Sequence, residues 1–149
     1  PEELVQASRV FDKESLVFIK GDVFKLNIPA GVVDGIVLNA SVQYFSDLNL
    51  LIKRLFELLK TDGEIHFIDS PFYTPAECDA AKERTQSYYE RIGFPEMAAH
   101  YFHHTYEEIS EFNYDILYKP VKRSRLLQLL TGRDIPFPWI RIKHADNDQ

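Results

Sequence analysis

Polar residues follow three apolar segments of this chain, at the points where the predicted strands end. Gly21-Asp22 follows the first segment, Asn39-Ala40-Ser41 the second and Asp69-Ser70 the third. Their carboxylate, amide and hydroxyl groups can accept or donate hydrogen bonds to a polar ligand. Because ligands of open α/β sheets bind beyond the carboxyl ends of the strands, we expect these loops to line one crevice.

The segments before these polar residues alternate between strand and helix patterns. Apolar and β-branched runs predict strands at residues 16–20, 32–40 and 64–69. Between the last two, leucines recur at helical spacing over residues 48–59, and we expect this helix to end at Gly63. Strand, helix and strand in succession are typical of the crossover unit of a parallel sheet.

Two capping patterns predict the helices of the second half. Thr74 followed three residues later by Glu77 predicts a helix that runs to about residue 92, just before Gly93. Thr105 and Glu108 repeat this spacing, so we expect two short helical turns over residues 94–112, the second opened by Thr105.

The C-terminal part of the chain predicts an antiparallel strand pair. Residues 112–120 alternate between aromatic or aliphatic and polar side chains, and residues 138–143 form another apolar alternation. The connection between them has no long crossover helix, only a brief amphipathic helix or loop at residues 122–132. We therefore expect these two strands to pair antiparallel at an edge of the sheet.

Composition narrows the class of protein. At 149 residues the chain fits one domain, and no apolar run approaches the roughly 18 residues of a membrane span. The net charge of −6 argues against binding nucleic acid through bulk electrostatics. Cys78 is the single cysteine, which excludes an internal disulfide framework and a multi-cysteine metal site. We expect a cytoplasmic protein that binds neither nucleic acid nor membrane.

Residues 16–72 resemble the later part of a class I S-adenosylmethionine-dependent methyltransferase. The resemblance lies in an ordered set: a strand ending in Gly21-Asp22, a short loop, an Asp34-Gly35 strand, a helix, and a Leu-Lys-x-x-Gly turn into the next strand. It implies an α/β fold, namely a partial, Rossmann-like open sheet that is mostly parallel and ends in an antiparallel C-terminal hairpin.

The resemblance also implies a cofactor site. By position, Asp22 would meet the adenine amino group of S-adenosylmethionine, and Val23 beside it would supply backbone. Asn39, Ala40 and Ser41 would border the methionine part of the cofactor. The alternatives are that Asp22 is a turn residue bonded to its own backbone and that Asn39 caps the end of a strand.

One part of the methyltransferase pattern is missing. No Gly-x-Gly occurs in the 149 residues, and the family's sheet places two further strands between the segments at 16–20 and 34–39. Without them, the strand at 16–20 must pair with the next strand, join another chain or peel away. We therefore expect residues 1–149 to form a single, truncated domain of a longer enzyme that self-associates through its exposed sheet edge.

The function that the resemblance implies is methyl transfer to a small molecule in the parent protein. Such transfer depends on alignment of the reacting atoms, so we assign no catalytic side chain. Tyr44 and Tyr73 are predicted walls of the acceptor pocket, with ordinary packing as the alternative. The alternative function is a non-catalytic domain that associates through its sheet edge and the aromatic region 88–118. A nucleotide-binding oxidoreductase half is a third reading, which the antiparallel ending disfavours.

The remaining reactive side chains do not indicate chemistry. His100, His103 and His104 lie close together, but no cysteine or convergent acid spacing accompanies them, so we predict packed or exposed histidines and no metal site. Cys78 falls on the apolar side of the predicted helix that Thr74 opens. We interpret it as a buried, inert thiol.

Overall fold

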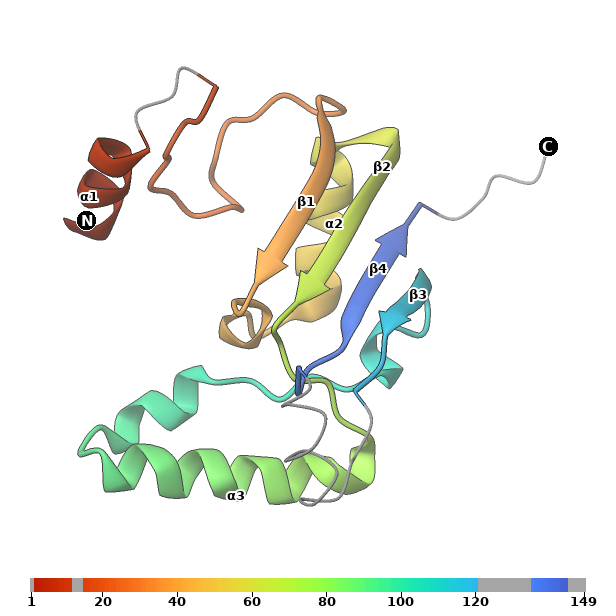
Figure 1. Ribbon diagram of the computed structural model, residues 1–149. Coiled ribbons are helices and arrows are strands. Elements are labelled where there is room, and N and C mark those ends of the chain that lie inside the picture. Colours follow the sequence, from red (N-terminus) through yellow and green to blue (C-terminus); the bar gives the residue numbers. More distant parts are fainter. Residues whose placement is uncertain (1, 12–14, 121–134, 145–149) are drawn as a thin grey trace, which may run out of the picture.

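The fold is that of a computed structural model, which describes residues 2–11, 15–120 and 135–144 (Figure 1). The predicted helix or loop at residues 122–132 lies outside these residues. Within them, no helix is both long enough and apolar enough to cross a membrane.

Four strands form one mixed sheet. In spatial order they are β1 (Val33–Asn39), β2 (Leu59–Ile68), β4 (Trp139–Lys143) and β3 (Asn113–Tyr118). β1 and β2 are parallel and are joined by helix α2 (Leu48–Leu58), whereas β4 pairs antiparallel with both β2 and β3. The α/β class, the crossover and the C-terminal antiparallel pair are confirmed. The prediction of a mostly parallel sheet is wrong, because only one of these three pairings is parallel.

The predicted strand at residues 16–20 does not form. The segment has no regular structure, and the side chains of Leu16, Val17 and Ile19 are 45%, 75% and 59% exposed. A strand needs a neighbour for its backbone N–H and C=O groups, and no described strand lies beside it. Of the three outcomes considered from the sequence, pairing of this segment with the next strand of its own chain is therefore wrong. Helix α1 (Glu2–Val10), which precedes it, contributes no buried residue.

One face of the sheet packs against α2 and the short 3-10 helix η3 (Glu107–Ile109) to form the core. Alternate residues of β2 and β4 point to this face, whereas Glu64, His66 and Arg141 between them point to the other. Each buried large aliphatic or aromatic side chain contributes about 1.5–3 kcal/mol. The central members of the core are Leu51, Ile52, Leu55, Ile65, Phe67, Ile109, Ile140 and Ile142.

Helix α2 ends earlier than its sequence predicts. Asp47 caps its first turn, where the carboxylate accepts a 2.8 Å hydrogen bond from the Leu50 N–H. The helix stops at Leu58 because Leu59 is already extended, buried and paired with Val33 of β1. Gly63, the predicted helix end, lies instead inside β2. A Cβ there would lie 2.8 Å from Leu59 Cδ2, so close packing explains this glycine.

Helix α3 (Pro75–Arg91) and the 3-10 helix η2 (Pro95–His100) lie beyond the carboxyl ends of β1 and β2 (Figure 1). The predicted capping interaction forms, since the Glu77 carboxylate accepts hydrogen bonds from the Thr74 N–H (3.1 Å) and hydroxyl (2.9 Å). Gly93 follows the helix with a left-handed φ of 83°. The two short helical turns predicted over 94–112 are present as η2 and η3. These elements cover the edge of the sheet where the polar loops emerge.

Candidate functional site

Both parallel strands end in a strained turn. Ala40 follows β1 with φ of 48°, and Asp69 follows β2 with φ of 50°. The Ala40 N–H donates a 3.0 Å hydrogen bond to the Ile68 carbonyl, so the two turns lie side by side. Left-handed conformations cost non-glycine residues about 1–2 kcal/mol, and they concentrate at functional sites. The carboxyl edge of β1 and β2 is therefore the first place to look for a site.

An extended segment, residues 101–106, lies across both strand ends. The Phe102 N–H donates to the Gln43 carbonyl (2.8 Å) in the loop after β1, and the Tyr73 N–H donates to the His104 carbonyl (3.0 Å) in the loop after β2. The Tyr106 N–H returns to the Tyr73 carbonyl at 3.2 Å. These backbone bonds fix the segment at the edge of the sheet, with successive side chains pointing to opposite sides.

His104 anchors this segment from beneath. It is 3% exposed, its Nε2 lies 3.2 Å from the Val42 carbonyl oxygen, and its Nδ1 lies 2.8 Å from a carboxylate oxygen of Glu108. The Val42 carbonyl and the Glu108 carboxylate thus face the two ring nitrogens and hold the imidazole in place. His104 is a packed histidine, as the sequence predicts.

The other side of the segment carries a row of aromatic rings. The Tyr101 ring centroid lies 6.0 Å from that of Tyr44 and 5.2 Å from that of His103, and His103 lies 5.6 Å from Tyr73. Tyr89 of α3 joins the row 6.5 Å from Tyr101. The structure thus places Tyr44 and Tyr73, the two predicted wall residues, at the ends of one continuous aromatic surface.

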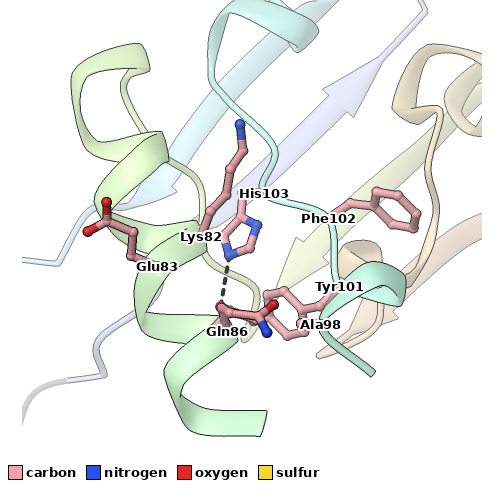
Figure 2. A pocket seen from close by; sticks show the side chains of 8 residues that line it. Lys82, Glu83, Gln86, Ala98, Tyr101, Phe102 and His103 are labelled. Carbon is pink, nitrogen blue, oxygen red and sulfur yellow. Dashed lines mark hydrogen bonds between the residues drawn. The ribbon is translucent and has the colours of Figure 1, made fainter. Parts of the chain in front are cut away.

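Beside this row, a recess of about 430 Å³ opens between α3 and residues 98–103 (Figure 2). We call it the α3 recess. His103 lies within it, and its Nε2 is 2.8 Å from the hydroxyl oxygen of Thr85. The recess is lined by Lys82, Glu83, Thr85, Gln86, Ala98, Tyr101, Phe102 and His103.

Burial sets the protonation of the two ring side chains in the α3 recess. Desolvation, and then the nearby charge of Lys82, lowers the pKa of His103. Desolvation, and then the neighbouring phenols of Tyr73, Tyr44 and Tyr89, raises the pKa of Tyr101 to about 12. Both rings are therefore uncharged at neutral pH.

Asp22 lies in a turn that its own side chain stabilises. Its carboxylate accepts a 3.0 Å hydrogen bond from the Phe24 N–H and lies 3.5 Å from the Lys25 ammonium group. The Phe24 ring meets the Phe45 ring at 6.3 Å, which holds this turn beside the segment that follows β1. These contacts correspond to the turn role that the sequence analysis gave as the alternative, and together they engage both carboxylate oxygens.

Arg54 of α2 fastens the same turn from the helix side. Its Nε donates to the carbonyl of Val23 at 3.2 Å and its Nη2 donates to the carbonyl of Leu26 at 2.9 Å. Val23 itself is half-buried against the core. Arg54 therefore sets the position of the predicted adenine-side residues, although nothing in its helical spacing indicated this.

Gln43 is a site residue that the sequence analysis missed. It lies in the 3-10 helix η1 (Val42–Tyr44) that follows Asn39, Ala40 and Ser41, and its Nε2 donates a 2.8 Å hydrogen bond to the Ala40 carbonyl. Its side chain is 8% exposed, yet its Oε1 has no donor among the described residues. An unpaired buried acceptor costs about 1–3 kcal/mol. In the sequence, only its position as a single amide side chain among apolar and aromatic residues could have indicated a special role.

His66 lies away from this edge, whereas Cys78 lies next to the segment that crosses it. His66 points to the open face of the sheet, where its Nδ1 accepts a 3.0 Å hydrogen bond from the Trp139 indole and its Nε2 lies 3.2 Å from Glu64. Cys78 is partly buried in α3, and its Sγ lies 3.6 Å from the His103 carbonyl oxygen. In the part of the chain that the structure describes, no three His, Cys, Asp or Glu side chains are grouped to hold a metal ion.

The sequence of the chain was compared with models of known protein families and with curated proteins. Residues 1–67 match the family model of the methyltransferase domain. The match confirms the methyltransferase resemblance. No curated protein matches the chain.

Solved structures, two of them described as S-adenosylmethionine-dependent methyltransferases, share the fold. YcgJ of Bacillus subtilis aligns with a TM-score of 0.62 and 17% identity, over 95% of this chain and 76% of its own. A SAM-dependent methyltransferase of Thermotoga maritima, for which histamine N-methylation is suggested, aligns with a TM-score of 0.54 and 14% identity, over 94% and 70%. A candidate S-adenosylmethionine-dependent methyltransferase of Methanococcus maripaludis aligns with a TM-score of 0.50 and 16% identity, over 99% and 62%. The chain therefore spans 62% to 76% of these relatives.

Proposed function

We propose that this chain supports methyl transfer from S-adenosylmethionine to a small molecule, at the carboxyl edge of β1 and β2 in its parent protein. The observation that carries the proposal is the pair of left-handed turns at Ala40 and Asp69, which lie side by side next to an unpaired buried acceptor on Gln43. S-adenosylmethionine supplies a methyl group on a sulfonium, and the transfer forms one bond to the acceptor as the carbon–sulfur bond breaks. Few side chains are needed beyond those that align the reactants.

The residues present fit the methionine end of the cofactor better than its adenine end. Asn39 is exposed at the tip of β1, and Ser41 makes no capping bond to η1, so both side chains are available to polar groups of a ligand. Gln43 Oε1 has no donor within the described part of the chain, and an ammonium group or an ordered water could provide one. At the adenine end, Asp22 already uses one carboxylate oxygen for the Phe24 N–H and the other for Lys25, so a hydrogen bond from the adenine amino group would share an oxygen with one of these contacts.

Calorimetry of the 149-residue chain with S-adenosylhomocysteine tests this proposal. We expect micromolar binding, about tenfold weaker in Asn39→Ala, which removes the amide at the tip of β1. Asp34→Ala is the matched control, because Asp34 is exposed at the opposite end of β1 and bonds Lys60 at 2.6 Å. Absence of binding, or equal losses in both variants, would reject the site in this chain.

A second candidate function is self-association through the outer edge of β1. Among the described residues β1 pairs with β2 alone, and Val37 at its middle is 59% exposed. A free strand edge with an apolar side chain is a template for a second copy of the chain. We expect sedimentation velocity to detect a dimer that Val37→Lys weakens and Leu117→Lys, on the opposite edge strand β3, leaves intact. A monomer at every concentration would exclude this function.

A further inference from the structure

The α3 recess holds polar and aromatic groups that cofactor binding does not use. Its volume of about 430 Å³ lies within the roughly 300–1,000 Å³ that small-ligand sites occupy. It adjoins the aromatic row that begins at Tyr44, immediately after the turn of Ala40, and Tyr101 belongs to both. A molecule in the recess would therefore lie next to the carboxyl edge of β1.

The interior of the recess carries no net charge. His103 and Tyr101 are both neutral near pH 7, for the reasons of burial given above, and Thr85 contributes a hydroxyl. The two charged groups lie at the rim. The Lys82 ammonium is 3.6 Å from the Asp79 carboxylate, and Glu83 points away from His103 (Figure 2). A cationic ligand would lose its hydration and meet the like charge of Lys82, which already reaches His103, whereas a neutral ligand would do neither.

The rings of the recess favour a planar partner. Tyr101 and His103 are tilted by 52° with centroids 5.2 Å apart, so their faces and edges present the offset contacts that a third ring can join. The imidazole of His103 and the hydroxyl of Thr85 are held 2.8 Å apart at one wall, where they can exchange a hydrogen bond with a ligand hydroxyl group.

The geometry points to the α3 recess as the binding pocket of the methyl acceptor, which is a neutral aromatic molecule that bears a hydroxyl group. Its ring packs on Tyr101, and its hydroxyl binds the His103–Thr85 pair. This assignment rests on the proposed function and names the class of its acceptor. Aliphatic amines, which are cationic at neutral pH, are excluded by the uncharged rings and the nearby positive charge of Lys82.

Amide chemical shifts of the full 149-residue chain test the assignment, with phenol as the ligand. We expect shifts confined to residues 82–86 and 98–103, and phenol affinity about tenfold higher than that of benzylamine, which has one ring but carries a positive charge. Shifts elsewhere, no saturable shift, or equal affinity for a charged analogue would overturn the assignment.

Variants separate the role of His103 from general damage. We expect His103→Gln to weaken phenol binding about fivefold, the value of one hydrogen bond, and His100→Gln, an exposed histidine of η2, to change it less than about twofold. If circular dichroism shows that His103→Gln is unfolded, Thr85→Val takes its place with the same expected loss. Unchanged binding in a folded His103→Gln or Thr85→Val variant would refute the role of the pair.

The two proposals can fail separately. Phenol binding at the recess without binding of S-adenosylhomocysteine would leave an aromatic-binding pocket and remove its assignment to a methyl acceptor. Binding of S-adenosylhomocysteine without phenol shifts at the recess would retain the proposed function and reject this acceptor class.

Discussion

Arg54 should stabilise the protein chiefly by fastening the turn at residues 22–26 to α2. Its side chain is 20% exposed and donates to the carbonyls of Val23 and Leu26, at 3.2 and 2.9 Å. It also pairs with Glu57 at 2.7 Å, but the Glu57 side chain is 63% exposed. Arg54→Ala removes all three contacts, whereas Glu57→Gln removes only the charge of the exposed pair.

The expected magnitudes differ enough to separate these effects. A charged donor on a carbonyl contributes about 1.5–3 kcal/mol when buried, and partial access of water to this exposed turn reduces each bond to about 1 kcal/mol. We therefore expect Arg54→Ala to lower the free energy of unfolding by about 2 kcal/mol. An exposed pair three residues apart on a helix contributes only about 0.3–0.5 kcal/mol, so Glu57→Gln should cost no more than that.

Urea unfolding of both variants measures these free energies, and hydrogen exchange shows where they act. The Lys25 and Leu26 N–H groups, which both donate to the Asp22 carbonyl at 2.9 Å, should exchange faster in Arg54→Ala and at the original rate in Glu57→Gln. Equal destabilisation by the two variants, or unchanged exchange in Arg54→Ala, would refute the reasoning that Arg54 holds this turn.

Three further predictions concern single side chains. His104→Leu should lower the free energy of unfolding by about 3 kcal/mol, because it leaves the buried Val42 carbonyl without its side-chain donor, whereas His100→Ala should cost less than about 0.5 kcal/mol in the same urea titration. The pKa of His103, measured by NMR, should lie below its ordinary value of 6.5, and Lys82→Gln should reverse only part of this lowering, since burial is the larger cause. Because the unfolded chain binds the proton more readily than the folded chain, the free energy of unfolding should fall as the pH drops below 6.5. Arg141 donates a 2.6 Å hydrogen bond to Asp115 and holds the pKa of that carboxyl below 3.8. The contribution of the pair to stability is therefore present above pH 3.8 and is lost as the pH falls through the lowered pKa. Arg141→Gln should return the pKa of Asp115, measured by carbon-13 NMR, towards its ordinary range.

Local patterns predicted most of the secondary structure. The capping box at Thr74 and the alternation of residues 112–118 each depend on side chains within a few positions, and each is present. At Thr105 the Glu108 carboxylate accepts a hydrogen bond from the Thr105 N–H, but the 3-10 helix begins one residue later than predicted, with Tyr106 as its N-cap. The prediction of a strand at 16–20 was wrong because a strand also depends on a partner strand, which local pattern does not reveal. The end of α2 at Leu58 was missed for a similar reason, since the pairing of Leu59 with Val33 decides it.

The candidate site was only partly predictable. Its location at the carboxyl edge followed from the order of strand and helix, and Tyr44 and Tyr73 do lie on one aromatic surface. Tyr101 and His103 were missed because they lie between two helical turns, in an extended segment whose position is set by backbone bonds to distant loops. Gln43 was missed because an unpaired acceptor is visible only after the surrounding chain is in place.

The central claim is that the carboxyl edge of β1 and β2 is the part of a methyltransferase fold that holds the cofactor. The most direct test is to map the amide shifts that S-adenosylhomocysteine causes in the 149-residue chain, including the side-chain amide of Gln43. We predict saturable shifts at residues 22–23 and 39–44 together with the Gln43 amide. Saturable shifts confined to other parts of the chain, or none at all, would contradict the claim.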